Sequence, residues 1–245
     1  MKTLTKTKVN GFVRMLDMGE AIQRSMAKGK YEPEQTAWVK KTLGRGGRFV
    51  DIGANFGYYT SLASSIVGPT GRVFAFEPSP VAQESLREMV ELNRITNIEL
   101  IHAAVGDRAG SIELLLPLDG PVHSPSIFAS EGNFTAFTVP MIALDDYAPL
   151  NDGVAIDLMK IDVEGFEPNV IAGLQSLAKR GQIRNLLCEF NSGWLRRNLN
   201  TTPAQLLESI LALGFKIATQ GKKVTGLESC GKITYELQDI LFTRH

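Results

Sequence analysis

Apolar and polar positions follow two alternating patterns in the first half of the chain. Short apolar runs at 48–53 ("RFVDIG") and 72–78 ("RVFAFEP") are typical of buried strands. Each run is followed by a stretch with apolar residues at helical spacing, at 54–67 and 79–93, and a third strand is predicted at 98–107. This order of strand, helix, strand, helix, strand favours parallel strands joined by right-handed crossovers.

The second half contains an interruption before the strand and helix order resumes. Strands are expected at 111–117 and 137–144, with a loop rich in Gly, Pro and Ser at 118–133, and they form a β insertion around 110–145. The pattern then predicts, in order, a strand, a helix, a strand, a helix and two terminal strands: 154–162, 168–180, 183–190, 202–214, 215–219 and 235–243. A strand pair that ends a parallel series is typical of a mixed sheet edge.

Residues 1–45 lack this pattern and are predicted to form an N-terminal helical extension. One helix opens at Glu32-Pro33, because Pro suits the first helical position. The stretch "GRGG" then interrupts the chain before the first core strand. We therefore expect residues 46–245 to form a single α/β domain that contains the β insertion.

Composition narrows the choice of partner and location. The chain has 245 residues, 44% hydrophobic and 21% charged, and its 26 basic and 26 acidic residues give no net charge. Proteins that bind nucleic acids are usually basic, so no nucleic acid partner is expected. No apolar run approaches the ~20 residues of a membrane span, and the basic N-terminus has no apolar signal core, so a cytoplasmic protein is expected. Homo-oligomer formation is left open.

The two cysteines give no sign of a metal or disulfide framework. Cys188 and Cys230 are far apart in the sequence and fit no C-x-x-C spacing. Cys188 lies in the apolar run "NLLCEF" and is expected to be a small buried hydrophobic residue.

The stretch "FVDIGANFGYYT" (49–60) is the strongest local motif. An apolar strand runs into Asp51, then Gly53, then Gly57 at the predicted start of a helix. Glycines let the backbone turn tightly and approach a ligand closely, and a helix start offers free N–H groups. The motif lacks G-K-[ST], and its glycine spacing differs from G-x-G-x-x-G, so a pyrophosphate site is disfavoured. A turn without a ligand is the alternative.

Glu77 ends the second strand in "VFAFEP". In open α/β sheets an acidic residue at this place can bind a ribose diol. The diol offers two O–H donors and a carboxylate only accepts, so the chemistry matches the position. A solvated residue at a strand end is the alternative, and the glycine motif and Glu77 together are more specific than either alone.

Three carboxylates fall within "MKIDVEGFEP" (159–168), directly after a predicted core strand. Asp162 lies at the carboxyl end of that strand, where ligands of open α/β sheets gather. Asp162 or Glu164 is a candidate general base, provided that burial raises its pKa. Acidic residues also suit the first turn of a helix. We favour that role for Glu167, and it remains an alternative for Glu164.

A metal site is a further hypothesis for the same edge of the sheet. Glu189 and Asn191 end the strand at 183–190 and are expected to lie beside Asp162. Oxygen ligands suit hard cations, so Asp162, Glu189 and Asn191 are a candidate Mg²⁺ set.

Five other residues have side chains that could take part in catalysis or ligand binding. His123, in the 118–133 loop, is a candidate base or substrate contact, because histidine titrates near neutral pH. His102 is expected to pack inside the third strand, and His245 is terminal. Trp194 and Arg196 could wall a sugar pocket or pack on the surface.

"DIGANFGYYT", "FEPSP", "AAVGD" and "KIDVEGFE" together resemble the FkbM-type S-adenosylmethionine-dependent methyltransferases. The resemblance extends upstream to "GKYEPEQTAWVKKTL" and covers roughly residues 29–215. It implies a class I methyltransferase fold, which is a Rossmann-like α/β fold. Its seven-stranded, mostly parallel sheet has helices on both faces and an antiparallel last strand. It also implies O-methylation of a hydroxyl on a sugar, glycan or secondary metabolite.

The resemblance also implies where S-adenosylmethionine binds. Its methionine part would be surrounded by Asp51, Gly53, Asn55 and Gly57, and its ribose hydroxyls would be held by Glu77. Its adenine would lie beside Pro78, Ser79, Ala104, Val105 and Asp107. Asp162 would lie near the transferred methyl group. The implied set is Asp51, Gly53, Ala54, Asn55, Gly57, Glu77, Pro78, Ser79, Ala104, Val105, Asp107 and Asp162. Many class I enzymes have an acid at the Ala104 position, and this chain does not.

The sequence therefore predicts an O-methyltransferase that uses S-adenosylmethionine and acts on a small-molecule or glycan acceptor. Two alternatives stay open. The chain could be a catalytically inactive cofactor-binding module, because fold does not imply function. An NAD-dependent oxidoreductase is the other, and it would need the pyrophosphate turn that "GANFG" lacks.

Overall fold

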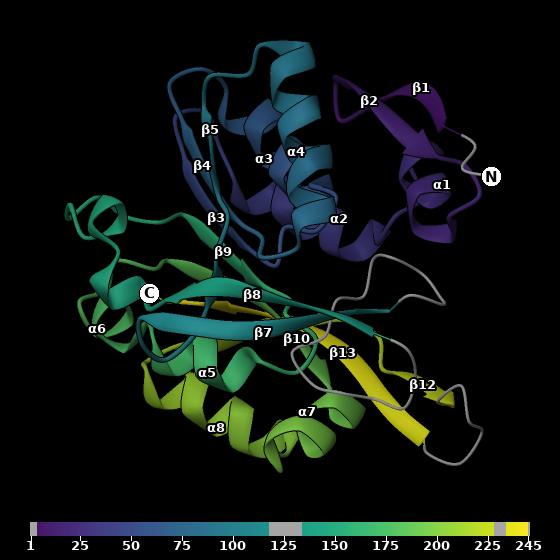
Figure 1. The fold of residues 1–245 in the computed structure, drawn as a ribbon. Coiled ribbons are helices and arrows are strands. Elements are labelled where there is room, and N and C mark those ends of the chain that lie inside the picture. Colours follow the sequence, from purple (N-terminus) through teal and green to yellow (C-terminus); the bar gives the residue numbers. More distant parts are fainter. Residues whose placement is uncertain (1–3, 118–133, 228–233, 245) are drawn as a thin grey trace.

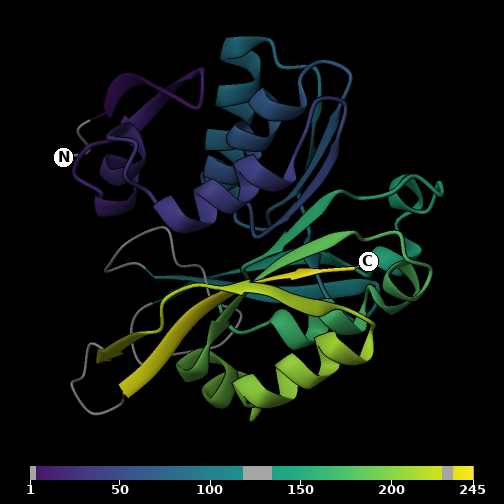
Figure 2. The same cartoon turned by 180° about the vertical axis from the view of Figure 1, so that it is seen from behind.

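The computed structural model describes residues 4–117, 134–227 and 234–244. Within these residues a large twisted sheet carries helices on both faces, a three-stranded sheet lies beside it, and a two-stranded hairpin lies near the N-terminus (Figures 1 and 2). The mixed α/β fold with a large, mostly parallel sheet is as the sequence predicts.

The large sheet has the strand order β11-β13-β10-β9-β3-β4-β5, and the short strand β12 pairs with β13 off this path. The strands from β10 to β5 run parallel, whereas β13 is antiparallel to β10 and β11. Among the described residues this sheet therefore has eight strands, one more than the sequence predicts. Their bounds are β3 Arg48–Ile52, β4 Arg72–Phe76, β5 Ile98–Ile101, β9 Leu158–Ile161, β10 Asn185–Asn191, β11 Lys216–Gln220, β12 Val224–Leu227 and β13 Thr234–Thr243.

Successive residues of the central strands enter two separate cores. In β3, Phe49 faces one apolar cluster and Val50 faces the other, and Leu158 and Met159 of β9 divide in the same way. Side chains of a strand alternate between faces, so a strand buried on both faces needs a continuous apolar run. This is why these strands are visible in the sequence as unbroken apolar stretches.

Helices cover both faces of the sheet, and two of the longer ones begin at side-chain caps. Ser79 accepts a hydrogen bond from the backbone of Ala82 at the start of α4, and Thr202 forms a capping box with Gln205 at α8. The helices are α1 Ala21–Ala27, α2 Pro33–Thr42, α3 Tyr58–Val67, α4 Pro80–Asn93, α5 Glu167–Ala172, α6 Gln175–Lys179, α7 Ser192–Leu199 and α8 Pro203–Ala212, with 3₁₀ turns η1 Leu144–Asp146 and η2 Ala148–Leu150.

The helix predicted at 168–180 is two short helices, α5 and α6. The break falls at Gly173, where a Cβ would lie 1.9 Å from the carbonyl oxygen of Gly106. Close packing of two backbone segments therefore ends α5, and helical periodicity alone does not reveal such a contact.

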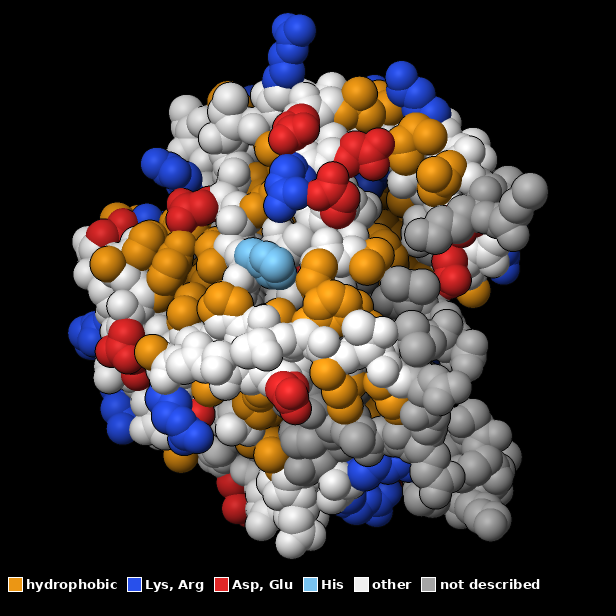
Figure 3. All heavy atoms as spheres, viewed as in Figure 1, with side chains coloured by type: hydrophobic (Ala, Val, Ile, Leu, Met, Phe, Trp, Pro, Cys, Tyr) orange, Lys and Arg blue, Asp and Glu red, His pale blue; other side chains and the backbone are white. Residues whose placement is uncertain are grey.

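The strand predicted at 98–107 is also divided. β5 ends at Ile101, and β6 (Ala104–Val105) joins β8 (Phe134–Ile142) and β7 (Gly110–Pro117) in the three-stranded sheet. His102 lies at the break and is exposed (Figure 3, pale blue), so the expectation that it packs in the core is wrong. Its Nε2 lies 2.9 Å from the carbonyl oxygen of Pro78.

The N-terminal segment begins as a hairpin. Strands β1 (Leu4–Val9) and β2 (Phe12–Asp17) pair antiparallel around Asn10 and Gly11, which both have positive φ angles. The expectation of a helical extension is therefore wrong for these residues, although α1 and α2 follow. Asn-Gly between two short strands is a strong hairpin signal, and it was available in the sequence. The domain boundary near residue 45 stays a prediction.

Among the described residues no helix is both long and apolar enough to cross a membrane. The longest of them, α4, has 14 residues, whereas a span needs ~20 apolar residues. A cytoplasmic location and the formation of homo-oligomers are not tested by the structure and stay predictions.

Candidate functional site

A cavity of about 230 Å³ lies at the carboxyl ends of β3, β4, β9 and β10. Its walls come from the turns after β3 and β9, the end of β4, the strand β6 and the segment before α2. A smaller cavity of about 30 Å³ lies next to it and shares five lining residues: Ile22, Tyr31, Gly53, Asn55 and Asp162. Ligands of open α/β sheets bind in this place.

Gly53 and Gly57 shape the turn between β3 and α3. Gly53 has a φ of 80°, and a Cβ there would lie 1.9 Å from the carbonyl oxygen of Asp162. Gly57 caps α3 with a φ of 74°, and its Cβ would lie 2.2 Å from the side chain of Leu86. Only glycine allows these approaches, so this turn can lie directly against the end of β9 and against α4.

Asp51 is buried at the end of β3 and supports the smaller cavity. Its Oδ2 accepts a hydrogen bond from the Thr60 hydroxyl at 2.6 Å. Burial raises the pKa of Asp51, and the nearby Lys160 ammonium acts in the opposite direction. Ala54, which was also predicted to contact the cofactor, lines the same cavity.

Glu77 lies at the edge of the larger cavity with its carboxylate held in place. Its Oε2 accepts from the backbone N–H of Asn55, and its Oε1 accepts from that of Ser79, both at 2.7 Å. Burial raises the pKa of Glu77 to about 7, although these two hydrogen bonds favour the ionised form. The carboxylate therefore faces the cavity in a fixed orientation.

The predicted adenine side contains four of the residues named from the sequence. Pro78, Ala104 and Val105 line the larger cavity, and Ser79 caps α4 next to it. Asp107 lines neither cavity and pairs with the exposed Arg108 at 2.9 Å. A contact between Asp107 and the adenine stays a prediction.

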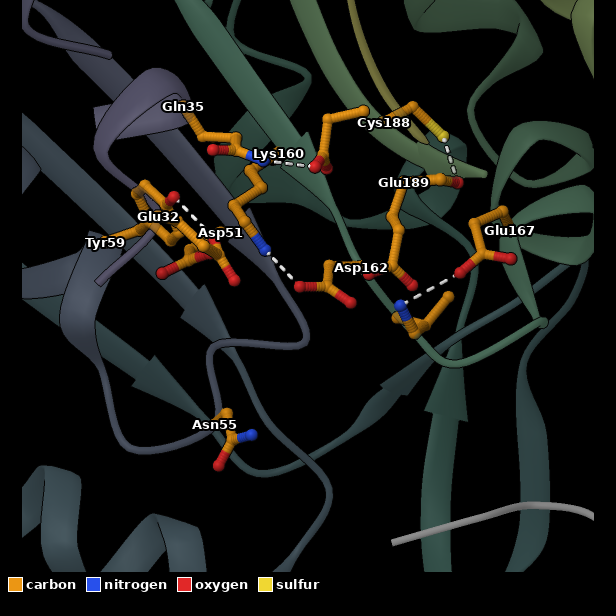
Figure 4. Close-up of polar contacts among 12 residues, drawn as sticks. Glu32, Gln35, Asp51, Asn55, Tyr59, Lys160, Asp162, Glu167, Cys188 and Glu189 are labelled. Carbon is orange, nitrogen blue, oxygen red and sulfur yellow. Dashed lines mark hydrogen bonds and ion pairs between the residues drawn. The ribbon is translucent and has the colours of Figure 1, made fainter. Parts of the chain in front are cut away.

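Asp162 lines both cavities and is anchored by a buried lysine (Figure 4). The Nζ of Lys160 lies 2.6 Å from Oδ2 of Asp162 and 4.9 Å from the centre of the Tyr59 ring. Burial alone would lower the pKa of Lys160, but the carboxylates of Asp162, Asp51 and Glu32 outweigh it and raise that pKa. The lysine thus remains a cation beneath the cavity.

Glu164 lines the larger cavity in a strained backbone conformation. Its φ is 53°, in the left-handed region that costs a residue other than glycine ~1–3 kcal/mol. Burial, followed by the charges of Asp162 and Glu167, raises the pKa of Glu164 to about 8. A partly buried carboxyl with a pKa near neutral has the properties of a general base.

The predicted magnesium set is not supported. Glu189 lines the larger cavity beside Asp162, but Oδ1 of Asn191 accepts from the backbone N–H of Gly193 and Trp194 and so caps α7. Among the described residues no cluster of three or more His, Cys, Asp and Glu side chains is placed to hold a metal ion. The need of the α7 N-terminus for a cap explains why Asn191 is in this position.

Glu189 contributes a buried carboxyl group to the wall of the larger cavity. Its Oε2 is buried and has no hydrogen-bond partner among the described residues. Burial, and then the charges of Asp162 and Glu164, raise the pKa of Glu189 well above its ordinary value.

The remaining candidates lie outside the site. Glu167 begins α5 as favoured, and it is fully buried, with Oε1 accepting from the backbone N–H of Val163 and Gly165. Trp194 and Arg196 are on α7 and line neither of the two cavities. His123 and His245 are outside the described residues.

Tyr31 and Glu32, from before the first core strand, also line the cavities and are not among the residues predicted from the sequence. Tyr31 lines both cavities, and Glu32 lines the larger one. Glu32 also accepts a hydrogen bond from the Tyr59 hydroxyl at 2.6 Å (Figure 4). The "YEPE" stretch indicates the start of a helix and forms part of the family resemblance, but neither assigns its acidic residue to a site.

Comparison with known proteins identifies relatives of this chain. It is 30% identical over 138 residues to the 2-O-methyltransferase NoeI of Sinorhizobium fredii, covering 51% of this chain and 56% of that protein. It is 29% identical over 167 residues to the 31-O-demethyl-FK506 methyltransferase FkbM of Streptomyces tacrolimicus, covering 57% of this chain and 63% of that protein. The chain thus matches less than two thirds of the length of either relative.

One solved structure shares the fold, and a family profile matches more than half of the chain. The tRNA m1G37 methyltransferase of M. jannaschii superposes with a TM-score of 0.50 at 12% identity, over 100% of this chain and 57% of that one, which shows a shared fold. The profile of the Methyltransferase FkbM domain matches residues 51–217, from the end of β3 to β11. The chain therefore belongs to the FkbM methyltransferase family.

Proposed function

We propose that this protein is an S-adenosylmethionine-dependent O-methyltransferase that acts on a hydroxyl of a sugar, glycan or secondary metabolite. One observation carries the proposal. A single cavity is lined by the glycine turn after β3, by the carboxylate of Glu77, and by the acids Asp162 and Glu164 at the end of β9. It therefore combines groups suited to a nucleoside with a candidate base.

The residues present fit the cofactor that the family uses. Glu77 has both oxygens fixed by backbone N–H groups, and a carboxylate so oriented suits the two hydroxyls of a ribose. The apolar side chains of Phe76, Ala104 and Val105 line the same cavity, as a purine ring requires. Gly53 leaves room where a Cβ would clash with Asp162.

S-adenosylmethionine supplies a methyl group on a positively charged sulfur. An alcohol is a poor nucleophile, so the protein has to orient it and take its proton. We assign the proton to the carboxylate of Glu164, whose raised pKa makes it a stronger base than an ordinary glutamate. Asp162, held by Lys160, orients the ligands at the same edge of the sheet.

The acceptor class rests on the activities of the two relatives, as their names give them, and on the residues of the cavity wall. The names of NoeI and FkbM both specify methylation of an oxygen. Glu32, Glu164 and Glu189 add acceptors for hydrogen bonds, whereas no Lys, Arg or His of the described residues lines the larger cavity. An uncharged acceptor rich in hydroxyl groups suits such a wall. An RNA acceptor, as in the tRNA methyltransferase that shares the fold, is an outcome that the assay below separates.

Two measurements test the proposal. Calorimetry with S-adenosylmethionine and with NAD separates a methyltransferase from an oxidoreductase, and binding of NAD alone would overturn the proposal. A labelled-methyl assay over sugars, glycans, polyketide alcohols and RNA then separates an enzyme from an inactive module. We expect transfer to a neutral hydroxyl acceptor, and Glu164→Gln should lower its rate by about 10²–10⁴. Cofactor binding with no transfer to any acceptor class would favour the inactive module.

A further inference from the structure

The segment between α1 and α2 brings a strained glutamate to the edge of the cofactor pocket. Glu32 has a φ of 39°, and it lines the larger cavity next to Tyr31. It directly precedes Pro33, the first residue of α2. Non-glycine residues in the left-handed region are costly and gather at functional sites. Asn55 and Glu164, on the same cavity, also have positive φ angles.

Contacts with α3 hold Glu32 in this position. The Tyr59 hydroxyl, in the first turn of α3, donates to Oε2 of Glu32 at 2.6 Å. The rings of Tyr31 and Tyr58 pack edge to face at 4.9 Å between centroids. Further along α2, Gln35 donates to Asp239 of β13. These contacts tie the segment before α2 to α3, and α2 itself to β13; Glu32, Gln35 and Tyr59 are labelled in Figure 4.

The carboxylates around Lys160 outnumber the single ammonium group in this part of the site. Asp162, Asp51 and Glu32 are the three carboxylates whose charges act most strongly on Lys160. One lysine ammonium therefore faces three carboxylates around the smaller cavity and its junction with the larger one. Carboxylates so placed bind a second ammonium group well, because they accept charge-assisted hydrogen bonds.

We propose that Glu32 binds the α-ammonium group of S-adenosylmethionine, so that the N-terminal segment recognises the amino-acid half of the cofactor. This inference rests on the proposed function. Asp162 lines both cavities and is the second acceptor for the same ammonium group. The hydrogen bond from Tyr59 keeps the Glu32 carboxylate turned toward the cavity. The segment before the first core strand is thus part of the cofactor site.

Calorimetry with two compounds that share a neutral thioether sulfur isolates the contribution of the charged amino-acid half. S-adenosylhomocysteine carries it, and 5′-methylthioadenosine has a methyl group in its place. Glu32→Gln removes the charge and keeps the size of the side chain. We expect this variant to bind S-adenosylhomocysteine about ten- to a hundredfold more weakly, as for the loss of a charged hydrogen bond, and to bind 5′-methylthioadenosine as the unaltered protein does.

Two further variants sharpen the test. Glu34→Gln removes the same charge from an exposed residue that lines neither of the two cavities, and it should bind both compounds normally. Tyr59→Phe removes the hydrogen bond that orients Glu32 and should weaken binding of S-adenosylhomocysteine alone, by a smaller factor. This second variant carries the test by itself if Glu32→Gln does not fold.

The outcomes separate this inference from the proposed function. Unchanged affinity of Glu32→Gln for S-adenosylhomocysteine would overturn the role of Glu32 and leave the proposed function intact. Equal weakening for both compounds would also overturn it, because the segment would then support the pocket only as structure. An unaltered protein that binds neither S-adenosylmethionine nor S-adenosylhomocysteine would overturn the proposed function, and this inference with it.

Discussion

Lys160 and Asp162 meet at the carboxyl end of β9, with Nζ of the lysine 2.6 Å from Oδ2 of the aspartate. One residue separates them, so strand geometry places both side chains on the same side of the sheet. Lys160 is 4% exposed, and Asp162 lines both cavities. The pair therefore anchors the predicted ligand-binding carboxylate to the core.

Asp162→Asn is expected to lower methyl transfer at least about a hundredfold, since the pair orients the ligands. It should also lower the free energy of unfolding by about 3 kcal/mol, because it removes a partner of a buried ammonium. Urea unfolding and the labelled-methyl assay measure the two effects. Asp152→Asn is the control, because its ion pair with Arg48 is 39% exposed on the aspartate side and should be worth less than ~1 kcal/mol. Near-normal turnover of Asp162→Asn would remove Asp162 from the chemistry.

Glu164→Gln should lower turnover by about 10²–10⁴, which is the usual contribution of a general base. The base must be ionised, and the pKa of Glu164 is raised to about 8. In the unaltered protein kcat/KM should therefore rise with pH and level off above about 8, whereas the variant should show no such rise. Glu208→Gln, an exposed glutamate of α8, provides the control. A pH profile that is the same with and without Glu164 would contradict this role.

Much of the site was predictable because parallel strands end at one edge of a sheet. Gly53 follows β3, Glu77 follows β4 and Asp162 follows β9, and all three line one cavity. Each is next to an apolar run that is visible in the sequence. The order of strands and helices was predictable for the same reason, since strands buried on both faces need continuous apolar runs.

Other features depend on contacts between segments far apart in the sequence. Glu32 meets Tyr59 through a positive φ angle and a hydrogen bond, and neither follows from periodicity. His102 leaves its strand because the next residues join another sheet. Asn191 was assigned to a metal because its role as the cap of α7 was not recognised. The sequence therefore predicts which polar residues follow the core strands, but not the residues with which polar side chains form hydrogen bonds.

Asn191→Ala tests the corrected role of that residue. Loss of the cap of α7 should cost about 1 kcal/mol of unfolding free energy. We expect methyl transfer by the unaltered protein to be the same with and without EDTA, because both hydrogen bonds to Oδ1 of Asn191 come from backbone N–H groups. Turnover that EDTA abolishes and Mg²⁺ restores would contradict this assignment.

Cofactor binding should release protons near neutral pH. The pKa of Glu77 is raised to about 7 and that of Glu164 to about 8, so both carboxyls are partly protonated in this range. A bound cation favours the ionised form and lowers both pKa values. The affinity for S-adenosylmethionine should therefore increase from pH 6 to about pH 8. Calorimetry in buffers with different ionisation enthalpies counts the protons, and Glu164→Gln should release fewer. An affinity that is constant over this range would contradict the linkage.

Glu167 should make the ligand-free protein less stable in mild alkali. Burial raises its pKa from 4.5 to about 7, although three backbone hydrogen bonds act in the opposite direction. A raised carboxyl pKa means that folding favours the protonated form. The stabilisation is fully present below pH 4.5 and is lost as pH rises through about 7. Its upper limit is about 3 kcal/mol, from the size of the shift.

Glu167→Gln isolates this contribution, because glutamine does not titrate and keeps an oxygen for the N–H groups of Val163 and Gly165. Thermal unfolding at pH 5 and pH 8 should show a smaller loss of Tm in the variant than in the unaltered protein. Some loss should remain, since Glu77 and Asp239 also have raised pKa values. Glu88→Gln, on the exposed face of α4, should leave the difference unchanged. An equal loss of Tm in Glu167→Gln and in the unaltered protein would show that Glu167 does not titrate in this range.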